Sequence, residues 1–187
     1  MNRPKAPTSR PQPLSATQIA ARIRHATGYS ELGMPADALR ELQPVDESRL
    51  LPSRAGKVVL ALRGDALRDL GRFEEARAVY SRLLKVSPKM VAAAVGKAWC
   101  EKRLGTLDEA IRTLERAVRL NPREAILQYN LACYHALETD KARCLSRLGV
   151  AIRLDRSYAA MVREERDFDP IRSDRDFATL VEMAIGD

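Results

Sequence analysis

The sequence predicts an all-α fold, a solenoid in which about four helix pairs stack and a C-terminal helix closes the end. The first observation is a repeat: LGRFEEARAVYSRLLKVSP at residues 70–88 returns as LGTLDEAIRTLERAVRLNP at residues 104–122, which is an offset of 34 residues. The second is the spacing of apolar residues within each copy, i, i+4, i+7, which forms the stripe of an amphipathic helix. One helix pair cannot bury this stripe alone, so the copies must pack against one another.

The repeat divides the chain into three parts. Residues 1–15 are rich in proline and basic side chains and contain no acid, which predicts a disordered basic tail. Ser15 and Gln18 have the spacing of a capping box, so the first helix should begin there. The helix pairs fill residues 16–156, and residues 157–187 form a C-terminal cap. The four pairs are expected at about residues 16–43, 53–87, 88–121 and 122–155.

Glycine and proline mark the expected helix boundaries within the repeats. Gly71 and Gly105 should end the first helix of their units, because glycine readily adopts the left-handed backbone of a helix C-cap. Ser87 and Asn121 each precede a proline, which predicts an N-cap followed by proline at the first position of the next helix. The repeat therefore predicts both the turn within each pair and the start of the next pair.

Four residues depart from the repeat. Lys97 and Glu101 stand where the third unit should bury apolar side chains, so we expect a loosely packed seam near Glu101. Thr139 and Arg156 replace the glycine and the proline of the fourth unit. The last repeat should therefore end less sharply than the others.

The C-terminal segment has the pattern of a capping helix. Ser173 or Asp174 can serve as its N-cap, and Phe177, Leu180 and Val181 lie on one face of the helix that follows. This face would cover the apolar stripe of the last repeat, which would otherwise be exposed to water.

The repeated positions resemble those of the tetratricopeptide repeat family, particularly its small bacterial members. The likeness covers residues 19–156 and rests on a small residue at the eighth position, glycine near the fifteenth, alanine at the twentieth and proline at the thirty-second. In the second unit these positions are occupied by Gly64, Gly71, Ala76 and Pro88. The resemblance implies a right-handed superhelix whose first helices line a concave groove that binds protein segments.

The resemblance also implies which residues line the groove. They are Asp65, Arg68, Val95, Trp99, Lys102, Arg103, Tyr129, Asn130 and Cys133. Trp99 is the only tryptophan, and a large aromatic side chain near Arg103 and Tyr129 has the composition of a binding anchor. The alternative is that Trp99 covers the seam beside Glu101.

Composition argues against several other classes of protein. The net charge of +7 is the sum of +3 in residues 1–18, +4 in 19–90, +4 in 91–156 and −4 in 157–187. No segment has the dense lysine and arginine, interleaved with aromatic residues, of a nucleic-acid surface. No run approaches the ~18 apolar residues of a membrane span, so we expect a cytoplasmic protein without a membrane partner.

The sequence also shows no catalytic, cofactor or metal-binding signature. The three cysteines, Cys100, Cys133 and Cys144, lack a CxxC spacing and are interpreted as small buried residues. His25 and His135 lie in separate helices with no nucleophile or second base near them in sequence. We therefore expect no enzyme activity, no cofactor and no bound metal.

These observations predict an adaptor that binds another protein's segment in its concave groove. A segment with an apolar anchor and an acidic flank would meet Arg68, Lys102 and Arg103. The alternatives are a self-associating structural module and, less favoured, a nucleic-acid-binding accessory protein. The latter would use a basic stripe on the convex side, formed by Lys85, Arg119 and Arg153 with Arg82 and Arg116.

Overall fold

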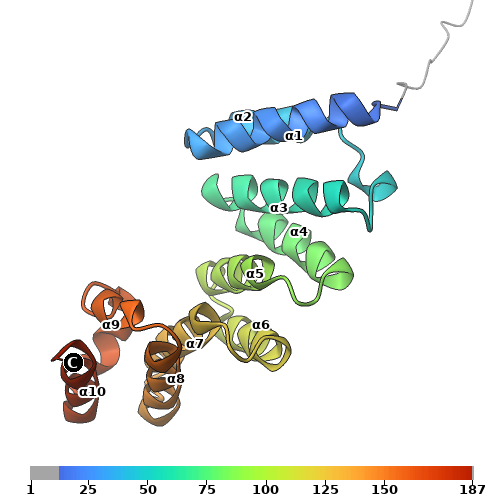
Figure 1. Ribbon diagram of the computed structural model, residues 1–187. Helices are drawn as coiled ribbons and strands as arrows, with labels where there is room; N and C mark the ends of the chain where they lie inside the picture. The colour runs from blue at the N-terminus through green and yellow to red at the C-terminus, as the bar shows by residue number, and fades with distance from the viewer. Residues whose placement is uncertain (1–12, 187) are drawn as a thin grey trace, which may run out of the picture.

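The computed structural model describes residues 13–186, and every regular element in this range is helical. Figure 1 shows the helices stacked in chain order from α1 to α8, with α9 and α10 beside α7 and α8. The successive pairs are α1 (Ala16–Glu31) with α2 (Pro35–Leu42), α3 (Arg54–Asp69) with α4 (Phe73–Val86), α5 (Val91–Arg103) with α6 (Leu107–Leu120), and α7 (Ala125–Leu137) with α8 (Lys141–Leu154). A short 3-10 segment, η1 (Glu47–Arg49), lies between α2 and α3. The C-terminal part consists of α9 (Ser157–Met161), a second 3-10 segment, η2 (Arg166–Ile171), and α10 (Arg175–Gly186). The fold is thus an all-α solenoid, as the sequence predicts.

The first helix begins where the capping box predicts. The Ser15 hydroxyl accepts a hydrogen bond from the Gln18 backbone N–H, and the Gln18 side chain accepts one from the Ser15 backbone N–H. Most of the predicted tail, residues 1–12, lies outside the described residues. Leu14, near its end, packs against the apolar cluster of the first helix pair.

The connections between repeats differ from the sequence prediction. Ser87 and Asn121 do not cap the following helices, which begin four residues later at Val91 and Ala125. Instead, both have a non-helical backbone with φ of −141°, and their N–H groups donate to the last turn of the preceding helix. The proline that follows each of them begins a turn rather than a helix. Ser87 and Asn121 therefore end one repeat instead of starting the next.

One tyrosine ring is enclosed between two repeats. Tyr80 projects from α4 and is 1% exposed. A methyl group added at Gly64 of α3 would lie 2.7 Å from its ring, and one added at Gly96 of α5 would lie 2.6 Å from it. The Tyr80 hydroxyl donates to the Asp65 carboxylate at 2.7 Å. Glycine on both sides therefore lets α3 and α5 close around the ring, and the hydrogen bond fixes its end.

The expected loose seam at Glu101 is wrong. Glu101 is 2% exposed, but its carboxylate accepts hydrogen bonds from the Lys97 ammonium group at 2.5 Å and the Thr113 hydroxyl at 2.8 Å. Lys97 also donates to the Thr113 hydroxyl oxygen at 2.7 Å. A buried carboxylate is tolerated when it is paired and hydrogen-bonded in this way. Lys97, Glu101 and Thr113 form what we call the polar triad, which joins α5 to α6.

Thr139 adopts the backbone conformation that glycine adopts in the earlier repeats. Its φ is +58°, while Gly71 and Gly105 have φ of +74° and +77°. The left-handed region is unfavourable for a β-branched residue, because the side chain crowds its own backbone. The fourth repeat thus keeps the turn geometry of the others and accepts local strain to do so.

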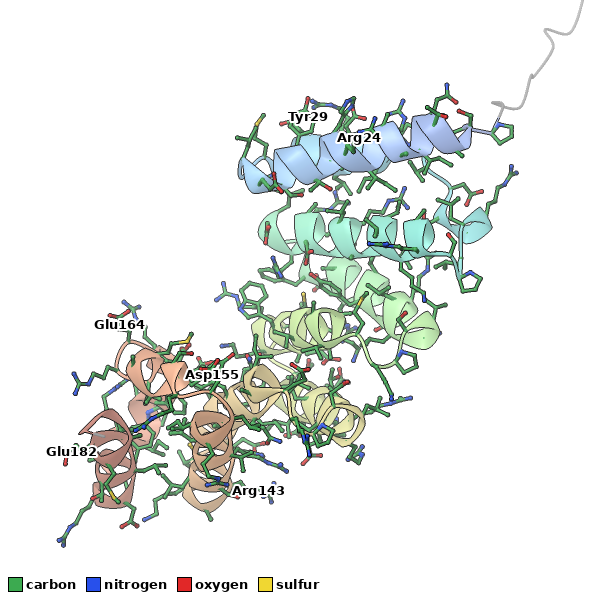
Figure 2. All side chains as sticks on the ribbon, viewed as in Figure 1. Arg24, Tyr29, Arg143, Asp155, Glu164 and Glu182 are labelled. Atoms are coloured by element: carbon green, nitrogen blue, oxygen red, sulfur yellow. The ribbon has the colours of Figure 1, made fainter. Side chains whose placement is uncertain are left out.

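The C-terminal segment packs on α7 and α8. Phe168 of η2 is fully buried, with its ring 5.8 Å from Tyr129 of α7 and 5.3 Å from Phe177 of α10. Asp174 caps α10 by accepting a hydrogen bond from the Phe177 N–H. Acidic side chains such as Glu164 point away from this packing (Figure 2). We refer to residues 157–184 as the cap.

The three thiols are buried in the helix packing. Burial raises the pKa of Cys100 to about 11 and raises the pKa of Cys133 and Cys144 further. Cys133 belongs to the apolar cluster that includes the cap residue Phe168, whereas Cys100 belongs to the cluster around Tyr80. All three are therefore protonated and weakly nucleophilic in the folded protein.

The Tyr80 packing predicts an unusual effect of a glycine-to-alanine substitution. Gly96→Ala should destabilise the protein by about 2 kcal/mol, because the overlap with the buried ring outweighs the helix propensity of alanine. Urea unfolding measures the change. Gly28→Ala is the control: Gly28 is also helical but has nothing within 4 Å of an added methyl group, so it should gain up to about 1 kcal/mol. In a Tyr80→Leu background the cost of Gly96→Ala should disappear. An unchanged cost there would contradict the proposed contact.

The left-handed turn of the fourth repeat predicts two opposite effects. Thr139→Gly should stabilise the protein by about 1 kcal/mol, because it relieves the backbone strain. Gly105→Thr, the reverse change one repeat earlier, should destabilise it by a similar amount. Calorimetric melting temperatures of the two variants test this, and a Thr139→Gly variant that melts below the wild type would show that the turn is not strained.

The packing of the cap predicts that Cys133 becomes exposed more readily than Cys100. Phe168→Ala should cost about 3 kcal/mol and increase the alkylation rate of Cys133 well above that of Cys100, because Cys133 shares a cluster with Phe168 and Cys100 does not. Iodoacetamide labelling followed by mass spectrometry compares the two thiols within one sample. Equal acceleration at both would mean that the variant opens globally and that the cap does not protect Cys133 in particular.

Candidate partner-binding wall

The predicted groove residues lie on three first helices, which we call the first-helix wall. Asp65 and Arg68 lie on α3. The remaining residues are Val95, Trp99, Lys102 and Arg103 on α5, and Tyr129, Asn130 and Cys133 on α7. The contacts of these side chains differ along the wall.

The centre of the wall carries two aromatic rings and one arginine. Trp99 and Phe73 are half-buried and meet edge to face, with ring centroids 5.3 Å apart and an interplanar angle of 78°. The guanidinium carbon of Arg103 lies 5.5 Å from the Phe73 ring centroid and 5.6 Å from that of Trp99. Cation–π attraction favours this placement. No acidic side chain among residues 13–186 pairs with Arg103, so its charge is available to a partner. We call these three residues the arginine–aromatic cluster.

Sequence reasoning missed Phe73. It is the first residue of α4, directly after the turn at Gly71, and not part of a first helix. The family resemblance assigns the groove to first helices and does not point to the start of a second helix. The sequence does contain one signal for Phe73, because it is an aromatic residue at the position where the next unit has Leu107. Trp99 itself packs on Phe73, while Glu101 points into the polar triad.

In the α3 part of the wall, the charged side chains pair with one another. Arg68 donates to the Asp69 carboxylate at 2.9 Å and to the Asp65 carboxylate at 3.4 Å. Asp65 also accepts the hydrogen bond of the Tyr80 hydroxyl. Burial, together with this hydrogen bond, raises the pKa of Tyr80, so the hydroxyl remains a donor at physiological pH. The charges of Arg68 and Asp65 are therefore already compensated within the protein.

The α7 part of the wall is covered by the cap, which corrects the prediction for two residues. Tyr129 is 4% exposed and lies against Tyr158, with ring centroids 4.7 Å apart. Cys133 is 2% exposed, and burial raises the pKa of its thiol. Both side chains were expected on an open groove, but the apolar residues of the cap bury them instead. Neither is accessible to a partner in this structure.

Of two other predicted residues, Lys102 joins the wall to the cap, whereas Asn130 bonds within its own helix. The Lys102 ammonium group donates to the Asp167 carboxylate of η2 at 2.5 Å and lies 5.2 Å from the Tyr134 ring centroid. Asn130 is half-buried and donates to the Ile126 carbonyl of its own helix at 2.8 Å. Lys102 thus anchors the cap, which makes the cap one side of the remaining open wall.

Two features of residues 13–186 bear on other classes of function. No group of three or more His, Cys, Asp or Glu side chains in this range is placed to hold a metal ion. None of the helices in the same range combines the length and the apolar character needed to cross a bilayer.

Comparison with known proteins agrees with the geometry. A family model described as tetratricopeptide repeat matches residues 62–125 and 101–143. A comparison with curated protein sequences gives no match. Solved structures with a similar fold include MamA 41-end from Desulfovibrio magneticus RS-1, at 19% identity and a TM-score of 0.66 over 92% of this chain and 98% of that one.

Two further solved structures show the same likeness. YrrB, described as a TPR protein with an unusual peptide-binding site, is 20% identical, with a TM-score of 0.63 over 80% of this chain and 77% of its own. TTC0263, a thermophilic TPR protein in Thermus thermophilus, is 18% identical, with a TM-score of 0.61 over 89% of this chain and 98% of its own. At these identities the solved structures show the fold, and the family model shows the repeat. The chain therefore carries tetratricopeptide repeats and has the fold of a tetratricopeptide repeat protein.

Proposed function

We propose that this chain is an adaptor that holds a segment of a partner protein against the open part of the first-helix wall, between α3 and the cap. Tetratricopeptide repeats form protein–protein interaction modules, which gives the general class. The observation that supports this particular surface is the arginine–aromatic cluster. Half-buried aromatic rings beside an arginine are the composition that dominates binding energy in protein interfaces.

The contacts of the wall narrow the chemistry of the segment. The rings of Trp99 and Phe73 offer a place for one apolar side chain. Arg103 offers one charge to an acidic residue next to it, whereas Arg68 and Lys102 are already bonded to carboxylates of this chain. We therefore propose a segment with an apolar anchor and a single neighbouring carboxylate, rather than a run of acidic residues.

The fold is suited to holding such a segment. The solved structure of YrrB is described as having an unusual peptide-binding site, so a protein of this fold can bind a peptide. In this chain Val95 is partly buried beside the cluster, and the cap closes the wall on the α7 side through Lys102 and Asp167. A segment lying on α5 would therefore contact both the cluster and the edge of the cap.

A capture experiment tests the proposal. A photoreactive phenylalanine at position 95 should crosslink a partner when the full chain is expressed in its native host, and Trp99→Ala with Arg103→Glu should reduce the crosslinked product about tenfold or more. Mass spectrometry of the product identifies the segment. Arg119→Glu, on the second helix α6, is the control and should leave the product unchanged, because Arg119 lies away from the wall.

The same experiment separates the alternative of self-association. In that case the crosslinked product would consist of two copies of this chain. If light scattering then showed a wild-type dimer that becomes monomeric in the Trp99 variant, the wall would be assigned to oligomerisation. A product that persists in the Trp99 and Arg103 variant would rule out the cluster as the binding surface.

A further inference from the structure

The other side of the solenoid has two pockets in equivalent positions. Each lies between the second helices of neighbouring repeats, with the first helix between them as its floor. The α2–α4 pocket has a volume of about 600 Å³ and the α4–α6 pocket one of about 570 Å³. Basic residues line both pockets, but their pairing differs.

In the α2–α4 pocket every arginine is paired. Arg40 is bonded to Asp37, Arg63 to Glu47 and Arg72 to Glu75. The positive charges that line this pocket are thus compensated by the chain itself, and a negatively charged ligand would have to displace existing ion pairs.

In the α4–α6 pocket the acidic residues are compensated instead. Glu101 is bonded to Lys97 within the polar triad, and Glu109 is paired with Arg77 of α4 at 3.2 Å. The side chains of the three other basic residues that line the pocket form no ion pair or hydrogen bond with any residue in the range 13–186, and all three are exposed. They are Lys85, Arg112 and Arg116.

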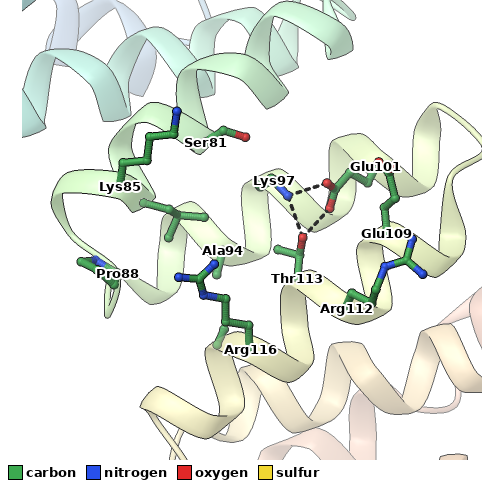
Figure 3. Close-up of a pocket in the computed structure, with 12 residues that line it drawn as sticks. Ser81, Lys85, Pro88, Ala94, Lys97, Glu101, Glu109, Arg112, Thr113 and Arg116 are labelled. Atoms are coloured by element: carbon green, nitrogen blue, oxygen red, sulfur yellow. Dashed lines mark hydrogen bonds and ion pairs between the residues drawn. The ribbon is translucent and has the colours of Figure 1, made fainter.

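The pocket also has a fixed and partly apolar floor. Figure 3 shows Lys97, Glu101 and Thr113 joined to one another at its base, and Arg116 extending over Ala94. Ala94 and Ala117 are buried, with exposures of 2% and 4%, and Leu84 packs against the same core. The walls therefore belong to the helix core, so the pocket needs no rearrangement to admit a side chain.

We propose that the α4–α6 pocket binds an acidic peptide segment of a partner protein. Carboxylate side chains of the segment would pair with Lys85, Arg112 and Arg116, while their methylene groups lie on the apolar floor. A nucleic acid fits less well, because no aromatic side chain lines the pocket for bases to stack on and two carboxylates are part of its lining. This site lies on the face of α5 opposite Trp99 and Arg103, and it goes beyond the function proposed for the first-helix wall.

A direct binding measurement tests the site. Fluorescein-labelled hexaglutamate should bind the full chain at low salt in a fluorescence anisotropy titration, and Lys85→Glu with Arg116→Glu should weaken it about tenfold. The control is Arg119→Glu with Arg153→Glu, which makes the same change in net charge on exposed residues of α6 and α8 outside the pocket. That variant should change affinity less than about twofold. Trp99→Ala should have no effect, which keeps this test separate from that of the first-helix wall.

Each other outcome overturns the proposal. Equal weakening by both charge variants would show a general attraction between basic protein and acidic peptide. Tighter binding of a labelled thymidine hexanucleotide that depends on the same pocket residues would assign the pocket to nucleic acid. A wild-type dimer in light scattering that Lys85→Glu with Arg116→Glu dissolves would assign it to a second copy. If circular dichroism showed that this variant does not fold, Arg112→Gln would replace it, with an expected loss of about threefold.

Discussion

The spacing of α3 and α5 depends on one enclosed ring. Tyr80 extends from α4 between Gly64 and Gly96, and its hydroxyl ends at Asp65 on the first-helix wall. Because protein interiors are close-packed, a ring held on both faces leaves little freedom in how the two repeats meet. The relative position of α3 and α5 decides how Arg68 and Trp99 lie along one surface. The position of α4 relative to α5 decides the width of the α4–α6 pocket on the opposite surface. Both candidate binding surfaces therefore rest on the same contact between repeats.

Local sequence signals predicted much of this fold because the chemistry behind them is local. The capping box at Ser15 and the left-handed glycines need only a few neighbouring residues, and the 34-residue period reports which helix faces must be buried. The signal at Ser87 and Asn121 was ambiguous. A short polar residue before proline suits the start of a helix, but it equally suits the non-helical residue that ends one, and only the backbone hydrogen bonds distinguish the two.

The candidate site was predictable only where it depends on a single helix. The face of α5 follows from helical periodicity, which placed Trp99 and Arg103 together. The burial of Tyr129 and Cys133 depends on Phe168, more than thirty residues later, and no local pattern indicates that η2 lies on α7. In the same way, the apolar pattern of the repeat predicts an apolar side chain at position 101, so Glu101 departs from it. It does not show that Lys97 and Thr113, on two helices, satisfy its carboxylate.

Internal ion pairing determines which charges of this basic chain are available for binding. The net charge of +7 is spread along the sequence, and composition alone does not locate it. Surface ion pairs contribute little to stability, about 0–1 kcal/mol each, so their main consequence here is the position of the charges that stay unpaired within residues 13–186. On the first-helix wall Arg103 keeps such a charge, next to aromatic rings. In the α4–α6 pocket, Lys85, Arg112 and Arg116 keep theirs, because the polar triad and Arg77 neutralise the pocket's own acids. The two proposed surfaces would therefore select segments of different composition, and since they use opposite faces of α5, binding at one would leave the other open.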